Sequence, residues 1–302
     1  DTVFPSSTDL AIKKEEERIY GPGIGDNSLG VAALFGLAWA ILPTEADEAA
    51  AISRFPGDIW LVANVGEEGL GNLRGIRAVV EQFAGEVKAY LVLEGMALGQ
   101  VYHRALGSMR FRISAKTAGG HSWMNYGDPS AIHELAKLVT RLSEIYIPAC
   151  PRTTLNVGII SGGTSINTIA AEATLELDLR SEDSTALQTL VTQVDRLVKA
   201  ANKKGVEMVA EEIGNRPSGG IPETHPLIQL ALNTLKDHGL QPNLIIGSTD
   251  ANIPLSLGYP SVVVGISNGF GAHTVGEFVQ TKPVALGMAQ LVSLVEGIFE
   301  KL

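Results

Sequence analysis

The pattern of apolar and polar positions along the chain predicts two kinds of structure. In the first and last parts, short apolar runs alternate with amphipathic stretches, which is typical of an α/β domain. From about residue 106 the order becomes strand, helix, strand, strand, helix, strand, as in a ferredoxin-like sandwich. Because the α/β pattern resumes afterwards, the sequence predicts a ferredoxin-like α+β domain inserted into an α/β domain.

We expect the α/β domain at residues 1–106 and 215–302, and the inserted domain at 107–214. The hydrophobic periodicity predicts helices at 31–42, 73–83, 129–145, 185–203, 226–238 and 284–301. Strands are predicted at 58–65, 87–93, 108–116, 153–160, 173–180, 206–213, 243–246 and 261–265.

Acidic residues follow two of the predicted strands of the α/β domain. Residues 58–65 form an apolar run that leads into Glu67 and Glu68, and the strand at 87–93 leads into Glu94. In open α/β sheets, ligands bind beyond the carboxyl ends of the strands. Glu67-Glu68 taken alone is more typical of a solvated turn than of a site, but two successive predicted strands that end in acids favour a site.

Two further residues have a comparable setting. Asp26 lies in the glycine-rich stretch 21–30 just before a predicted helix, where it is a candidate site residue or an ordinary helix cap. His273 follows a predicted strand and two glycines. Four acids and one imidazole brought together would repel one another without cations, so their convergence predicts a site for one or two divalent metal ions. Carboxylate and imidazole ligands suit zinc above all.

Composition narrows the classes of function. The chain has 302 residues, 45% apolar and 19% charged, with a net charge of -10. This charge argues against a nucleic-acid binder, and we expect no membrane span because we find no apolar run of about 18 residues. Cys150 is the single cysteine, so an internal disulfide and a thiolate metal cluster are excluded. We expect a cytoplasmic protein.

Other hydrolase motifs are not present. His133-Glu134 begins like a zincin helix, but Lys137 stands where the second histidine is needed. The chain has no Gly-x-Ser-x-Gly elbow, and Cys150 precedes a proline. Acyl-enzyme chemistry is therefore not favoured.

The chain resembles the zinc aminoacylase/carboxypeptidase family, which includes carboxypeptidase G, peptidase T, acetylornithine deacetylase and succinyl-diaminopimelate desuccinylase. The resemblance extends over nearly the whole chain and rests on the order of many short motifs. These are Asp1-Thr2-Val3, Gly25-Asp26-Asn27-Ser28-x-Gly30, Gly66-Glu67-Glu68-Gly69, Glu94-Gly95, Gly119-Gly120-His121-Ser122, Gly162-Gly163-Thr164-x-x-Asn167, Asn215-Arg216-Pro217, Ser248-Thr249-Asp250 and Gly271-Ala272-His273-Thr274. It implies a phosphorylase/hydrolase-like catalytic domain with an inserted lid and dimerisation domain.

The resemblance also implies roles for the acids and for His273. Asp26 would bridge two metal ions, most simply zinc, with cobalt and manganese as alternatives. Glu68 and His273 would complete one metal site, and Glu94 would belong to the other. That second site would also use a histidine two residues before Asp1, so we expect an N-terminal segment outside this sequence. Asp1 would orient that histidine.

The remaining roles concern catalysis and substrate binding. Glu67 would be the general base, and His121 would stabilise the oxyanion in the partner subunit's site. Arg216 would bind a substrate carboxylate and Asn167 would hydrogen-bond the substrate. A structural role stays open for both, and His121 could be an ordinary loop histidine.

The sequence therefore predicts a homodimeric metallohydrolase that cleaves an amide bond in a small peptide. The first alternative is an N-acyl-amino-acid deacylase, because both substrate classes present an amide and a carboxylate. The second is a non-catalytic scaffold, if the natural chain begins at Asp1.

Overall fold

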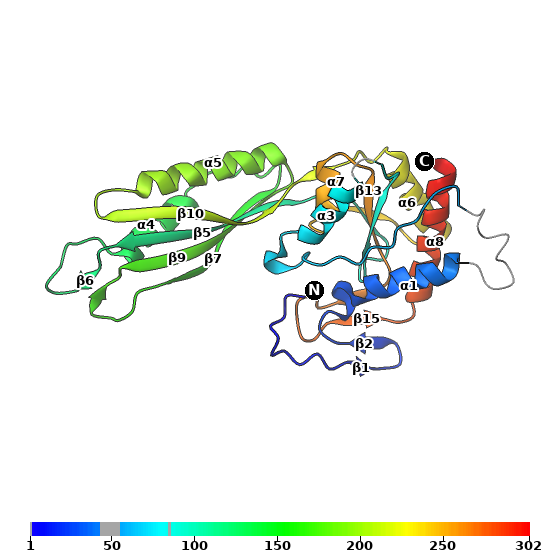
Figure 1. The fold of residues 1–302 in the computed structure, drawn as a ribbon, viewed down its shortest axis with the longest axis horizontal. Helices are drawn as coiled ribbons and strands as arrows, with labels where there is room; N and C mark the ends of the chain where they lie inside the picture. Colours follow the sequence, from blue (N-terminus) through cyan, green and yellow to red (C-terminus); the bar gives the residue numbers. More distant parts are fainter. Residues whose placement is uncertain (1, 43–54, 84–85) are drawn as a thin grey trace. The chain divides into compact units, whose positions relative to one another are not determined.

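The backbone forms two compact units. The computed structural model describes residues 2–42, 55–83 and 86–302. One unit combines Asp1–Ala105 with Gly219–Leu302, and the other is Leu106–Ser218 (Figure 1). The second junction lies beyond the expected 214/215, because strand β10 (Val206–Arg216) continues as far as Arg216. The inserted ferredoxin-like domain and the α/β domain that the pattern predicts are both present.

A mixed sheet forms the centre of the first unit, in the order β11-β4-β13-β3 with β12 also paired to β4. The strands are β3 (Tyr90–Glu94), β4 (Gln100–Ala105), β11 (Gly219–Gly220), β12 (Asn243–Gly247) and β13 (Ser261–Gly265). Strand β13 is buried at every position and pairs parallel to β3 and antiparallel to β4. The parallel pairing puts the ends of β13 and β3, and hence Gly265 and Glu94, side by side.

Helices pack around this sheet. They are α1 (Leu29–Ile41), α3 (Arg74–Phe83), α6 (Pro226–Asp237), α7 (Asn252–Ser256) and α8 (Val284–Lys301). Buried leucines, isoleucines and valines of α6, α8 and β13 form one continuous core with residues of α1. A smaller core joins α3 to Tyr90 and Ile253. These cores hold the strand ends in fixed positions.

The segment Ile24–Ile41 is long and apolar enough to cross a membrane, judged by length and hydropathy alone. Its first five residues, however, form an irregular turn with non-helical angles at Asp26 and Asn27, so the continuous α-helix has 13 residues. Thirteen residues rise by about 20 Å, which is short of the roughly 30 Å hydrocarbon layer. Because Ala33 and Leu37 are also packed in the core, α1 is a core helix of this unit.

A second, small sheet joins the beginning of the chain to its last quarter. Its order is β1 (Lys13–Lys14), β2 (Arg18–Tyr20), β15 (Phe278–Gln280) and β14 (Gly269–Phe270). The sequence does not predict these strands, because none exceeds three residues. The pairing of β15 with β2 brings the loop 271–277 next to residues 21–26.

One predicted strand is not found. Residues 58–65 are irregular and belong to no sheet, and Trp60 is 66% exposed. Within the described part of the chain, residues 57–65 make no backbone hydrogen bond. Ile59 still packs against the core and Trp60 against Phe83. The apolar pattern correctly indicates contact with the core, but the prediction of a buried strand is wrong because no described strand pairs with this segment.

The second unit is a ferredoxin-like sandwich. Its elements are β5 (Gly107–Thr117), α4 (Ala131–Ser143), β7 (Thr153–Gly162), β9 (Glu172–Ser181), α5 (Ser184–Ala201) and β10. The sheet is antiparallel in the order β10-β5-β9-β7, so β7 is an edge strand. Apolar residues of α4 and α5 pack on the inward positions of β5 and β9 to form a separate core.

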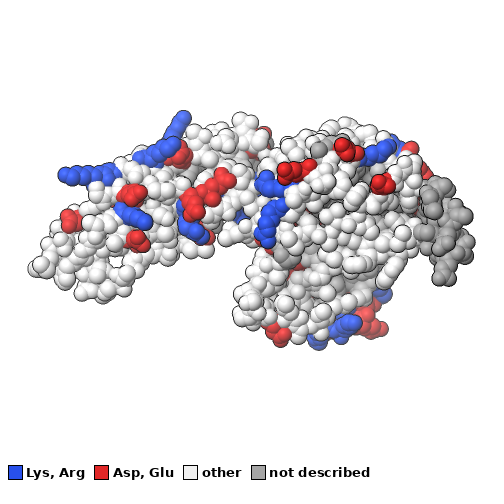
Figure 2. Space-filling model, in the orientation of Figure 1, with Lys and Arg blue, Asp and Glu red and all other residues white. Residues whose placement is uncertain are grey.

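The surface carries charges of both signs. On the face shown in Figure 2, Lys and Arg side chains lie among Asp and Glu side chains. Several form ion pairs on the second unit, for example Arg112 with Glu176 and Lys199 with Asp195. Pairs as exposed as these contribute little to stability.

Candidate metal centre

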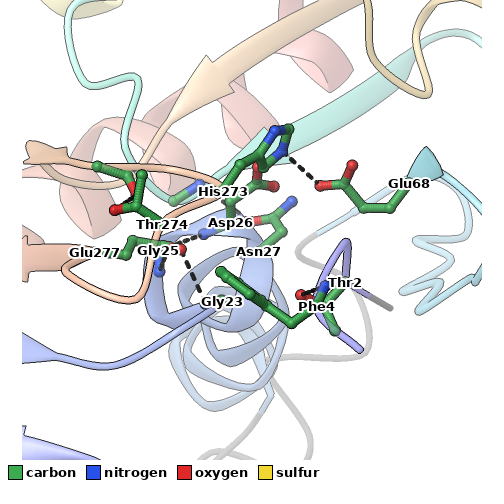
Figure 3. Close-up of polar contacts among 12 residues, drawn as sticks. Thr2, Phe4, Gly23, Gly25, Asp26, Asn27, Glu68, His273, Thr274 and Glu277 are labelled. Atoms are coloured by element: carbon green, nitrogen blue, oxygen red, sulfur yellow. Dashed lines mark hydrogen bonds and ion pairs between the residues drawn. The ribbon is translucent and has the colours of Figure 1, made fainter. Parts of the chain in front are cut away.

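Two carboxylates and one imidazole converge in the first unit. His273 Nε2 lies 3.0 Å from Asp26 Oδ2 and 3.2 Å from Glu68 Oε1. One ligand atom from each of the three residues lies within 4.8 Å of the others. Figure 3 shows the side chains of Asp26 and Glu68 directed toward the ring of His273. The structure therefore brings together three of the residues that the sequence predicts as metal ligands.

The donor set fits a divalent cation. Ligands about 2.0–2.2 Å from a zinc ion in a tetrahedral site lie about 3.3–3.6 Å from one another. The two distances from His273 Nε2 are within a few tenths of an ångström of this range. A neutral or charged ring has only one proton on Nε2, which cannot point at both carboxylates at once. A cation, by contrast, would contact the nitrogen and both oxygens together.

Asp26 is held by the turn that precedes α1. The side chain of Asn27 donates from Nδ2 to the Leu93 carbonyl at 2.7 Å, and its Oδ1 accepts from the backbone N–H groups of Gly30 and Gly95, both at 3.1 Å. A Cβ atom on Gly95 would collide with the carbonyl oxygen of Gly25. Asn27 and the glycine contact thus fix the Asp26 turn against the end of β3, where Glu94 lies.

His273 has a backbone conformation that few side chains adopt. It lies in the loop between β14 and β15 with φ of 64°. Histidine is among the residues that tolerate this left-handed region, but such positions cost of order 1–3 kcal/mol and cluster at functional sites. The loop is stabilised locally, since Gly271 O accepts from Thr274 N at 2.9 Å and from Thr274 Oγ1 at 2.7 Å. These bonds keep the imidazole directed at the two acids.

Glu94 lies in the same negative field. Burial is the largest cause that raises its pKa well above the ordinary value, and the charges of Asp26, Glu67, Asp250 and Glu68 raise it further. Glu94 is outside the group of three close ligands, but it is close enough for the charges of that group to raise its pKa. Excess negative charge of this kind is what a bound cation would neutralise.

The pKa values of Glu68 and His273 follow from the same cluster. Burial and the charge of Asp26 raise the pKa of Glu68, and His273 only partly opposes this rise. For His273, burial acts to lower the pKa, but the charges and hydrogen bonds of Glu68 and Asp26 outweigh it, so its pKa is raised. Without a metal ion, a proton on His273 therefore compensates part of the negative charge.

Known proteins resemble this chain in two ways: a family model matches the inserted unit, and solved structures share the fold of both units. Residues 104–206 match the family model of the peptidase dimerisation domain of the M20 family. A tripeptidase from Staphylococcus aureus superposes with a TM-score of 0.79 at 24% identity, covering 100% of this chain and 79% of that one. A dinuclear metal-binding peptidase of the M20 family from Bacillus subtilis gives 0.65 at 17% identity, covering 91% and 72%.

The chain therefore has the fold of M20 peptidases and carries a peptidase dimerisation domain at residues 104–206. In sequence it is 28% identical over 130 residues to a probable carboxypeptidase from Arthroderma otae, a match that spans 39% of this chain and 29% of that relative. The architecture of this fold, an α/β domain with an inserted ferredoxin-like domain, is the one that the sequence predicts.

The other predicted site residues have different surroundings. Glu67 is half-buried next to Glu68, and its charge raises the pKa of Glu94. Asp1 lies outside the described residues. Arg216 is 8% exposed at the end of β10 in the second unit. The roles predicted for Glu67, Asp1 and Arg216 therefore stay predictions.

His121 and Asn167 become neighbours in the second unit. His121, in the short strand β6 (Gly120–His121), pairs with Thr168 of β8 (Thr168–Ile169), and Ser122 N donates to Asn167 O at 3.0 Å. His121 Nδ1 accepts from the backbone N–H groups of Trp123 and Met124 at 3.2 and 3.4 Å. A neutral His121 ring therefore carries its proton on the exposed Nε2, where it could be donated.

Sequence reasoning missed two residues that support the centre. Asn27 was only part of the motif at residues 25–30 and had no assigned role. Glu277 had no assigned role, although it lies four residues after His273. An acid in a glycine-rich loop beside a candidate ligand is the signal that could have identified it.

Proposed function

We propose that this chain is the larger part of a metal-dependent hydrolase that cleaves the amide bond of small peptides. The observation that carries the proposal is the convergence of Asp26, Glu68 and His273, from three distant parts of the chain, on one point. Carboxylates with one imidazole are the ligands of hydrolytic zinc sites. The peptidases with the same fold support the choice of reaction.

We assign the centre two divalent metal ions, with zinc as the first choice. Asp26, Glu68 and His273 would hold one ion, and Asp26 would share the second with Glu94. When bound, the ions would polarise the amide carbonyl and lower the pKa of a water molecule. Cobalt and manganese accept the same ligands.

Glu67 would act as the general base. It would take a proton from the attacking water and pass it to the leaving amine, which is the work of a carboxylate next to, but not among, the metal ligands. Asp1 would orient a further ligand from outside this sequence. The acids Glu68 and Asp26 would hold the ring of His273 in position, as their distances support.

The inserted domain would form the dimer and complete the partner's site. Its exposed edge strand β7 offers unpaired backbone groups on which a second copy could continue the sheet. His121 would donate a hydrogen bond to the oxyanion in the partner's site. Arg216 would bind the substrate carboxylate, and Asn167 would hydrogen-bond the substrate.

The test is a panel of di- and tripeptides and N-acyl amino acids, assayed with zinc, cobalt or manganese. It should use the natural polypeptide, including any residues that precede Asp1. We expect peptide hydrolysis that a chelator abolishes, and loss of turnover in Glu67→Gln with unchanged metal content, because the substitution removes a base and no ligand. Normal turnover of Glu67→Gln would exclude Glu67 as the base.

An N-acyl-amino-acid deacylase is the less favoured alternative. The structurally similar S. aureus and B. subtilis proteins are named as peptidases, which favours a peptide substrate. Preference of the panel for N-acyl amino acids would reverse this order. Absence of turnover and of metal binding would leave the non-catalytic scaffold as the explanation.

A further inference from the structure

We propose that Glu277 is a positioning residue that locks the Asp26 turn to the His273 loop. This role rests on the proposed function, because it concerns the same metal centre. Glu277 is fully buried, with 0% exposure, at the end of the loop that carries His273. A buried carboxylate is costly unless polar groups surround it, so its partners indicate its purpose.

Among the described residues, the hydrogen-bond partners of this carboxylate all lie in the turn that carries Asp26. Glu277 Oε1 accepts from the backbone N–H of Gly25 at 2.7 Å and of Asp26 at 2.8 Å, and Oε2 accepts from Gly23 N at 2.9 Å (Figure 3). Three backbone N–H groups that converge on one anion form the kind of concavity that otherwise binds phosphate. Here the chain fills it with its own side chain.

The backbone of Glu277 also forms hydrogen bonds to both segments. Its carbonyl accepts from Gly21 N at 2.9 Å, and its N–H donates to Thr274 O at 3.2 Å. Glu277 is thus bonded to the residues before Asp26 and to the loop that carries His273. The pairing of β15 with β2 brings the two segments together, and Glu277 then fixes the Asp26 turn directly to the loop that carries His273.

The consequence is a preformed centre. With Glu277 in place, the Asp26 carboxylate and the His273 ring face each other at 3.0 Å before any ion arrives. Groups that orient metal ligands typically contribute 10- to 100-fold to metal affinity. We therefore expect Glu277→Gln, which replaces one acceptor oxygen by an NH₂ donor directed at backbone N–H groups, to weaken zinc binding about 10- to 100-fold.

The experiment is a zinc titration against a competing chelator, on the natural polypeptide with any residues that precede Asp1 and on variants of it that circular dichroism shows to be folded. Val279→Ala is the matched control, because Val279 is buried in β15 two residues away and its side chain has no atom that could accept a hydrogen bond from the turn. We expect Val279→Ala to lower the melting temperature without changing zinc affinity. Glu277→Asp keeps the charge but is one methylene shorter. Its zinc affinity should lie between those of the wild type and Glu277→Gln.

The outcomes separate the two proposals. If the wild type does not bind zinc, the metal centre itself is refuted. If the wild type binds and Glu277→Gln binds equally well, or if Val279→Ala weakens binding as much, the positioning role is refuted alone. Should the Glu277 variants not fold, amide exchange in the metal-free wild type decides, since the N–H groups of Gly23, Gly25 and Asp26 should exchange slowly, and fast exchange would overturn the assignment.

Discussion

Zinc binding by this chain should depend steeply on pH, because the ion must displace protons from two groups. Burial, with the neighbouring carboxylates, raises the pKa of Glu94 well above its ordinary value. Burial lowers the pKa of His273, but the charges and hydrogen bonds of Glu68 and Asp26 outweigh this effect, so its pKa is raised as well. At a pH just above the ordinary pKa of glutamate, which is still below the ordinary pKa of histidine, both groups should therefore carry a proton in the metal-free chain.

The magnitude follows from the number of protons. Each displaced proton changes the apparent affinity tenfold per pH unit, or by about 1.4 kcal/mol. The affinity rises with pH, because fewer ligands then hold a proton that the ion has to remove. Displacement of a proton from both His273 and Glu94 predicts that the zinc affinity increases about a hundredfold per pH unit over the range in which both groups hold a proton.

Isothermal titration calorimetry in two buffers with different heats of ionisation measures the released protons directly. Glu94→Gln and His273→Asn should each reduce the increase to about tenfold per pH unit, because one titrating group is gone. Glu172→Gln, which removes an exposed carboxylate of the second unit, should leave it unchanged. Zinc uptake without proton release, or a pH dependence that survives both substitutions, would refute the reasoning.

Two further predictions concern the second unit and the irregular segment. Mixing His121→Ala with Glu67→Gln in equal amounts should recover about a quarter of wild-type turnover if His121 serves the partner's site, because half of the dimers are mixed and each has one intact site. No recovery would place His121 outside that site. Backbone amides of residues 57–65 should exchange with solvent far faster than those of β13, as mass spectrometry of peptic fragments would show. Equal protection would mean that another strand pairs with this segment, and protection that grows with protein concentration would identify a second copy as that strand.

Helices and strands with strong periodicity could be predicted closely. The helix at 284–301 and the strand at 261–265 have the same bounds in the structure as in the prediction. Both elements bury apolar side chains in the same core, and this burial produces a periodic apolar pattern that can be read from the local sequence. Strands of two or three residues, such as β2 and β15, leave no such pattern, because their pairing partners come from distant parts of the chain.

The irregular segment 57–65 has a strong apolar pattern but forms no strand. Its apolar residues indicate contact with a core, and Ile59 makes that contact. Membership of a sheet, however, depends on a neighbouring strand, and a run of apolar residues cannot specify which strand that is. The same composition therefore gives a central strand in one setting and an exposed, unpaired segment in another.

The candidate centre also contains residues that the sequence could predict and one that it could not. Asp26 and His273 could be predicted because charged or metal-binding side chains in glycine-rich loops next to regular elements are unusual. Glu68 is predicted from its position after a strand that the structure does not contain, so its place in the cluster agrees with the prediction although the premise is wrong. Glu277 could not be predicted, because its partners are backbone N–H groups, which every residue but proline carries and which the sequence does not distinguish. If the positioning role holds, the ligands alone do not make the centre: affinity also depends on a carboxylate that never touches the ion, and a chain that keeps all the ligands but loses Glu277 would bind metal weakly.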